Sequence, residues 1–221
     1  MKLQPTTWSI VLVGWWNPAI LSPAGISKHI FKLPQDEKIQ VAIPLDGISA
    51  YIVSNPNETL DVHVEKERLQ IDIKKCNYDS LAEGMQAALN ALEVLPITPI
   101  KAIGYNLIFT APSSCAELIA VTECPLDTQI SDMGLKIIGR SFSRSITFGD
   151  GQVNFSVSGQ PEKFHVNCNF HLGTQDQEKA KTWLRTPVAV IREKVRNIGS
   201  ILKVQLEETQ NDGSNAPKPI A

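Results

Sequence analysis

His165, Cys168 and His171 form an H-x-x-C-x-x-H pattern, and imidazole nitrogen with thiolate sulfur is a typical donor set for zinc. The surrounding residues 164–172 alternate between apolar and polar side chains, as a strand with one buried face does. Cys168 falls in the apolar set and both histidines in the polar set, so a strand turns them to opposite faces. We therefore predict a strand with a buried cysteine and no metal site. A ligand-binding role for the two histidines stays open but is not favoured.

Two further patterns could supply a nucleophile. Ser200 and Lys203 match S-x-x-K, in which a lysine activates a serine, but the companion S-D-N and K-T-G motifs are absent. Cys115 follows Ser113-Ser114 at an expected helix start, where the helix dipole would favour a thiolate. We interpret both as structural, because the sequence contains no G-x-S-x-G, H-E-x-x-H, C-x-x-C or P-loop motif. The sequence therefore predicts no catalytic residue, no metal and no cofactor.

Trp15 and Trp16 end an apolar segment, and Asn17-Pro18 follows directly. Alternation along a strand turns neighbouring side chains to opposite sides, so one Trp is expected in the core and the other near the surface. An exposed Trp beside a rigid proline turn could anchor a protein partner. The alternative, that both rings pack beneath the following helix, is favoured.

The most informative segment is the helix expected over residues 176–205, which Thr186-Pro187 either kinks or divides. Its apolar side chains recur at spacings of four and three residues, which is the heptad pattern of a coiled coil. The same pattern suits a helix that packs on its own sheet, and we favour that interpretation over a coiled-coil dimer. This apolar seam consists of Leu184, Val188, Ile191, Val195, Ile198 and Leu202.

Cations follow one flank of the same helix. Residues 1–99 contain eight Lys or Arg against eleven Asp or Glu, whereas residues 100–205 contain twelve against nine. Most such flanks are only solvated. The functional alternatives are an acidic protein partner, the acidic half of a second copy, or a nucleic-acid backbone. Together with Trp15 and Trp16, the candidate interaction residues are Lys181, Arg185, Arg192, Arg196 and Lys203.

Strand-like and helical segments alternate along the chain. Strands are expected at 8–15, 39–45, 48–53, 60–64, 69–73, 100–110, 135–148, 152–158 and 163–172, with a hairpin turn at Asp46-Gly47. Helices are expected at 22–31, 78–94, 114–121 and 176–205. We predict an α+β fold in which an antiparallel sheet carries helices on one face. The order strand, helix, strands, helix occurs twice, so the predicted halves are 1–99 and 100–206, in one compact unit, before a mobile tail at 207–221.

This order, taken twice over residues 8–205, is similar to the duplicated arrangement of TATA-binding-protein-like folds. The resemblance implies one curved antiparallel sheet with the long helices on its back. It carries over no functional residue, because that family reads DNA with a basic surface and apolar wedges. The strand faces expected to be wet here are acidic and polar instead, with Asp61, His63, Glu65, Gln70, Asp72, His165, Asn167, Asn169 and His171.

The composition narrows the function classes. The 221 residues are 43% hydrophobic and carry a net charge of −2, which argues against non-specific nucleic-acid binding by the whole surface. Four irregularly spaced cysteines, no signal peptide and apolar stretches too short for a bilayer predict a cytoplasmic protein without a membrane partner. We expect a non-enzymatic interaction or assembly protein that self-associates or joins a larger complex. The alternatives are a nucleic-acid-associated protein that uses the cationic flank, and an enzyme with a dispersed, motif-free active site.

Overall fold

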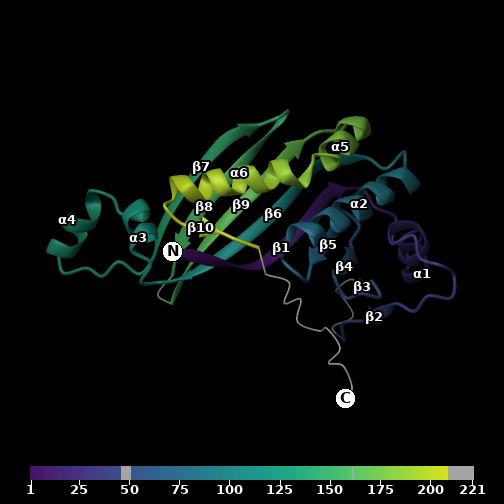
Figure 1. Ribbon diagram of the computed structural model, residues 1–221, viewed down its shortest axis with the longest axis horizontal. Coiled ribbons are helices and arrows are strands. Elements are labelled where there is room, and N and C mark those ends of the chain that lie inside the picture. The colour runs from purple at the N-terminus through teal and green to yellow at the C-terminus, as the bar shows by residue number, and fades with distance from the viewer. Residues whose placement is uncertain (46–50, 161, 209–221) are drawn as a thin grey trace, which may run out of the picture.

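A computed structural model describes residues 1–45, 51–160 and 162–208 (Figure 1). Its strands are β1 Lys2–Gly14, β2 Gln40–Ala42, β3 Ile52–Ser54, β4 Leu60–Val64, β5 Arg68–Ile73, β6 Ile100–Pro112, β7 Arg140–Phe148, β8 Gly151–Gly159, β9 Lys163–Gly173 and β10 Gln205–Leu206. Its helices are α1 Pro23–Gly25, the π-helical turn η1 Ile26–Ile30, α2 Tyr78–Val94, α3 Ala116–Thr122, α4 Leu126–Asp132, α5 Gln177–Leu184 and α6 Val188–Ile201.

Both halves of the chain contribute to one sheet. In the described part of the chain, the strand order is β2-β3-β4-β5-β1-β6-β9-β8-β7, and β10 pairs with β1 outside this path. The long central strands β1 and β6 run antiparallel, from the pair Gln4 and Thr110 to the pair Gly14 and Ile100. The predicted α+β class with an antiparallel sheet is confirmed, whereas the division into halves at residue 99 stays a prediction.

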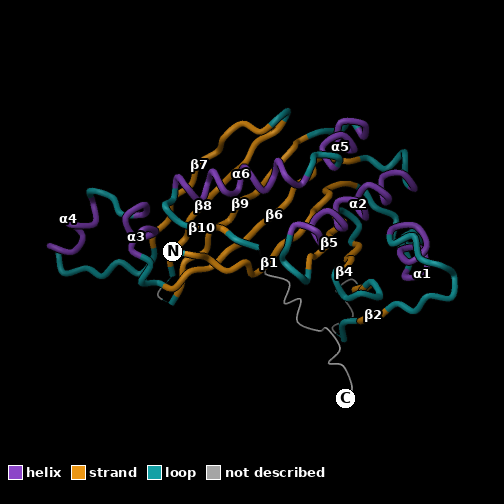
Figure 2. Tube along the Cα trace, in the orientation of Figure 1, coloured by secondary structure: helices purple, strands orange, loops and turns teal. Residues whose placement is uncertain are grey.

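Helices α2, α5 and α6 lie across one face of this sheet (Figures 1 and 2). The strands present alternate apolar side chains to them, and these form one core with the apolar side of the helices. The Tyr105 hydroxyl of β6 donates a hydrogen bond of 2.6 Å to the carbonyl of Trp183 in α5, and the two rings stack. No helix in the described ranges is long and apolar enough to cross a membrane.

Helix α2 has the predicted boundaries. The Asn77 side chain caps it by accepting a hydrogen bond of 2.8 Å from the Ser80 amide. Gly84 faces the sheet, where a Cβ would lie 2.6 Å from Ile73 Cδ1 and 3.1 Å from Ile10 Cδ1. The absence of a side chain therefore lets the helix approach the sheet closely.

The helix predicted over 176–205 is divided at Thr186-Pro187, one of the two outcomes expected there, but its predicted C-terminal end is wrong. Helix α5 ends at Leu184 and α6 begins after Pro187, whose ring nitrogen cannot donate to the preceding turn. Helix α6 ends at Ile201, and Lys203 adopts a left-handed backbone with φ of 57°. The chain then reverses into β10, which pairs with β1. The buried, alternating Leu202, Val204 and Leu206 suit this strand rather than a continued helix.

Other boundaries also differ from the predictions. Strand β7 begins at Arg140 rather than at residue 135, and residues 133–139 belong to no helix or strand. The sequence pattern did not indicate α4, a helix without a buried residue. Strands β2 and β3 have three residues each, and the predicted Asp46-Gly47 turn lies outside the described residues. Helix positions without a core partner leave no periodic signal.

The sheet face opposite α2, α5 and α6 carries the polar side chains of the strands, and we call it the polar face. A row of hydrogen-bonded side chains crosses it from β7 to β1. The row consists of Ser145 to Asn154 at 2.7 Å, Asn154 to Asn169 at 3.2 Å, Asn169 to Asn106 at 2.5 Å and Asn106 to Ser9 at 3.4 Å. These bonds join uncharged groups, so the row fixes side chains on this face without a buried charge.

On the β4 and β5 side, the polar face carries an ion pair whose strength depends on pH. His63 Nε2 lies 2.8 Å from Asp72 Oδ2, and this hydrogen bond raises the pKa of His63. The pair therefore contributes its full stability below the unfolded-state pKa of about 6.5 and loses it as pH rises through the folded-state pKa.

We expect His63→Asn to cost more stability in mild acid than in mild alkali. The difference should be at most about 1 kcal/mol, because both side chains are partly exposed. Urea denaturation of the two proteins at about pH 5.5 and about pH 9 measures it. A cost that is the same at both pH values would show that the pair adds no pH-dependent stability.

Candidate functional site

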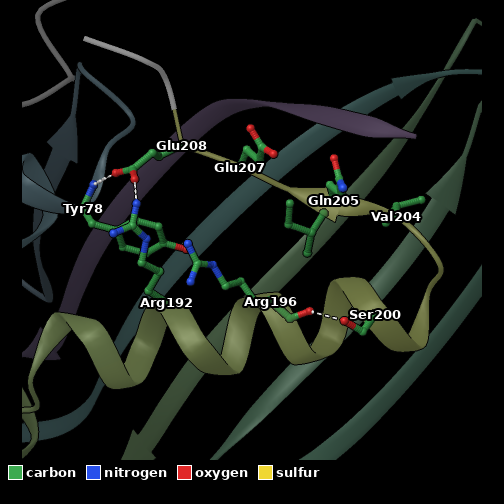
Figure 3. Close-up of a pocket in the computed structure, with 9 residues that line it drawn as sticks. Tyr78, Arg192, Arg196, Ser200, Val204, Gln205, Glu207 and Glu208 are labelled. Atoms are coloured by element: carbon green, nitrogen blue, oxygen red, sulfur yellow. Dashed lines mark hydrogen bonds and ion pairs between the residues drawn. The ribbon is translucent and has the colours of Figure 1, made fainter.

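A pocket of about 500 Å³ opens between α6, β10 and the first residue of α2 (Figure 3). We call it the α6–β10 pocket. The apolar side of α6 packs on the sheet, and this turns every fourth residue of the opposite side toward the pocket. Strand β10 forms the facing wall, because the left-handed turn at Lys203 returns the chain alongside α6. The lining residues are Tyr78, Arg192, Arg196, Ser200, Val204, Gln205, Leu206, Glu207 and Glu208.

A carboxylate of the chain itself occupies one end of the α6–β10 pocket. Glu208 Oε1 forms an ion pair with Arg192 Nη2, and Glu208 Oε2 accepts a hydrogen bond of 2.9 Å from the Tyr78 amide (Figure 3). Tyr78 is the first residue of the 17-residue helix α2, where backbone N–H groups lack helical partners and the helix dipole is positive. The Arg192 guanidinium also lies over the Tyr78 ring, 5.1 Å from its centroid.

The Tyr78 hydroxyl adds an unused donor. Tyr78 is only 6% exposed, and its hydroxyl has no hydrogen-bond partner among the described residues. Burial raises the pKa of Tyr78 well above its ordinary value, although the charges of Arg192 and Arg196 oppose the shift. The hydroxyl therefore stays protonated at neutral pH, and Figure 3 shows the Arg196 guanidinium beside it. Arg196 forms no ion pair within the described part of the chain.

These groups suit the binding of an anion. Two guanidinium groups, a protonated phenol and a helix-terminal amide belong to residues that line the same pocket, and all four are hydrogen-bond donors. The Ser200 hydroxyl donates to the Arg196 carbonyl at 3.1 Å, and Lys203 lies in the turn outside the pocket lining. Within this pocket, the S-x-x-K pattern therefore does not bring Lys203 beside Ser200.

The structure brings together two of the five predicted cations. Arg192 and Arg196 line the pocket, whereas Arg185 and Lys203 are exposed outside it. Lys181 forms an ion pair of 2.6 Å with Glu178 in α5. The seam that could have formed a coiled coil packs in the core of its own molecule, as we favoured, and Arg192 and Arg196 lie on α6 outside this core.

The two tryptophans lie on opposite sides, as alternation predicts, but the favoured interpretation that both are packed is wrong. Their backbone amides continue the strand pattern: the Trp15 N–H donates to the Pro99 carbonyl, and the Trp16 N–H donates to the Lys66 carbonyl. Trp16 is 3% exposed and its indole donates to a carbonyl within the core. Trp15 is 46% exposed, and the ammonium groups of Lys66 and Lys101 lie 5.3 and 5.7 Å from its ring.

Three of the four thiols, those of Cys76, Cys115 and Cys168, are buried, whereas that of Cys124 is exposed. Cys168 is fully buried, and burial raises its pKa to about 12, while His165 and His171 lie on the polar face as predicted. Burial also raises the pKa of Cys115, and the neighbouring Glu117 acts in the same direction through its side chain. The helix start therefore does not produce a thiolate at Cys115.

Sequence reasoning missed Tyr78 and Glu208. Glu207 and Glu208 were assigned to the mobile tail, yet Glu207 forms an ion pair with Lys2 and Glu208 one with Arg192. The remaining tail, 209–221, lies outside the described residues. The alternation of Leu202, Val204 and Leu206 was the signal that could have extended the fold to this point.

Comparisons with known proteins assign no family. No family model matches the chain, and no curated protein matches it. Among solved structures, the chain is similar to "Methanococcus jannaschii TBP" at 12% identity, covering 87% of this chain and 97% of that one, with a TM-score of 0.27. A similarity at this TM-score assigns neither a family nor a function to the chain.

Proposed function

We propose that the protein is a non-enzymatic interaction protein whose α6–β10 pocket binds acidic side chains of a partner polypeptide. The observation that carries the proposal is the carboxylate of Glu208, which lies between Arg192 and the amide end of α2. The pocket thus holds the kind of group that we expect a partner to present. A charge-assisted hydrogen bond of this type contributes about 1.5–3 kcal/mol.

Hydrogen-bond donors of the pocket that do not pair with Glu208 support the binding of a carboxylate from the partner. Arg196 lines the pocket and has no carboxylate partner among the described residues, and Tyr78 also lines it, with a buried hydroxyl that has no hydrogen-bond partner there. Arg192 and Arg196 are one helical turn apart, about 6 Å along the axis. Alternate side chains of an extended peptide are about 6.6 Å apart. A partner segment of the type Glu-x-Glu in extended conformation therefore matches the spacing of the two arginines.

The charges also favour an acidic polypeptide over a nucleic acid. Lys181 and Arg192 of the cationic flank already have carboxylate partners. The polar face carries Asp61 and Asp72, which would repel phosphates. Isothermal titration with capped peptides tests the proposal. One peptide contains Glu-x-Glu, its control contains Gln-x-Gln, and a DNA duplex of about 20 base pairs tests the nucleic-acid alternative.

We expect the Glu-x-Glu peptide to bind and Arg196→Ala to weaken its binding about tenfold, because one charge-assisted contact is lost. Arg185→Ala is the matched control, since Arg185 belongs to the same flank but lies outside the pocket. Glu208→Gln should strengthen binding by removing the competing carboxylate. Equal binding of the two peptides, or equal effects of the two arginine substitutions, would contradict the proposal. Binding of the duplex alone would favour the nucleic-acid alternative.

A further inference from the structure

Strand β7 forms an end of the sheet. It has nine residues and, within the described ranges, pairs only with β8. The two-residue turn Gly149-Asp150 joins the strands, so the flanking pair Phe148 and Gly151 exchanges backbone hydrogen bonds. Every second residue of β7 therefore bonds to β8, and the others direct their N–H and C=O groups to the open edge. These open-edge residues are Ser141, Ser143, Ser145 and Thr147.

The two sides of the sheet differ at this edge. Four strands, β5, β4, β3 and β2, continue from β1, but only β9, β8 and β7 continue from β6. Strand β3 has β2 as its outer neighbour, whereas β7, the corresponding third strand on the other side, has no outer neighbour among the described strands. The chain that precedes β7 forms α4 and the segment 133–139 instead, and Figure 1 shows α4 projecting away from the sheet.

Strand β7 lacks most features that protect an edge. It contains no proline, and the residues on its polar face are all serine or threonine. Its two cations lie on the core side, where Arg140 bonds to Asp127 at 3.0 Å and Arg144 lies 4.4 Å from the Phe142 ring centroid. The preceding segment is exposed and apolar as well, with Met133 and Ile138 each 76% exposed. Such a long, open edge is typical of a surface that pairs with another chain.

We propose that β7 pairs antiparallel with β7 of a second copy of this chain, with the twofold axis at Ser145. Registers centred on Arg144 or Phe142 place arginine opposite arginine, which is unfavourable. The register centred on Ser145 instead pairs residues 142–148 of the two copies and places Arg144 opposite Ile146, twice by symmetry. The hydrogen-bonded row on the polar face ends at Ser145, so the rows of the two copies meet at the axis.

Light scattering of the full chain should show twice the 24.3 kDa mass of the protomer. Ser145→Pro should return the monomer, because it removes an N–H at the open edge and leaves the bonds to β8 in place. Ser145→Thr is the matched control and should remain a dimer. A monomer at every concentration would overturn the proposal, and so would a dimer that Ser145→Pro leaves unchanged.

Cross-linking tests the register. In a Cys124→Ser background, which removes the exposed thiol, Ser145→Cys should form a disulfide-linked dimer on mild oxidation. Facing residues in such a pair have Cα atoms about 5.5 Å apart, which is within the range for disulfides. Ser141→Cys is the control, because it lies beyond the paired residues 142–148 and should stay monomeric on a denaturing gel. Cross-linking of Ser141→Cys but not Ser145→Cys would refute the register.

Discussion

Replacing Ile198 with aspartate is expected to unfold the protein. Ile198 is a fully buried residue of the apolar seam, and the substitution both removes an apolar side chain and places a carboxylate in the core. The lost packing costs about 2–5 kcal/mol and the buried charge several more, which together approach the whole stability of a typical domain. Circular dichroism and urea denaturation measure the loss.

The matched control is Ile201→Asp on the same helix. Ile201 is 62% exposed, so we expect its substitution to change the free energy of unfolding by less than about 0.5 kcal/mol. The comparison also distinguishes the two interpretations of the heptad pattern. If the seam formed a coiled coil, the Ile198→Asp protein would be a folded monomer. If the seam packs on the protein's own sheet, the same substitution unfolds the protein. A folded, monomeric Ile198→Asp protein would therefore contradict the structure.

Trp8→Ala should lower the free energy of unfolding by about 3–5 kcal/mol. The Trp8 ring is fully buried, with ring centroids 5.1 Å from Tyr78 and 5.8 Å from Phe109, so its removal leaves a large cavity beneath the α6–β10 pocket. We expect the loss of the contact with Tyr78 to weaken binding of the Glu-x-Glu peptide too. Urea denaturation and titration of the same preparation give both effects.

Trp15→Ala is the control for Trp8→Ala. Its half-exposed ring contacts two lysine ammonium groups, so the expected cost is at most about 1 kcal/mol, and peptide binding should not change. A similar loss of stability in both variants would mean that the exposed ring packs more tightly than the structure shows.

The fold was largely predictable from the sequence where burial imposes a clear period. Strands β4, β5 and β9 alternate strictly, and α2 repeats its apolar residues at helical spacing between Asn77 and Pro96, so the expected positions agree closely with the structure. Segments without a partner in the core gave no such signal. Helix α4 has no buried residue, and the apolar Leu135, Ile137 and Ile138 resemble part of a strand although nothing described pairs with them.

The pocket could be predicted only in part. The spacing of Arg192 and Arg196 placed both on one flank of a helix, but their neighbours depend on distant parts of the chain. Tyr78 lies more than a hundred residues earlier, and Glu208 follows a reversal that a left-handed lysine makes. A polar segment such as residues 207–208 carries no periodicity, so its ion pairs with Lys2 and Arg192 become visible only once the sheet is assembled.

The pairing of β1 with β10 has a consequence for how the chain acquires its structure during synthesis. Lys2 and Leu3 lie beside Gln205 and Leu206, so the start of β1 completes its pairing only after residues 205–206 have been synthesised. At about 5–20 residues per second, the delay is on the order of ten seconds or more. During this interval the first residues of β1 lack their β10 neighbours.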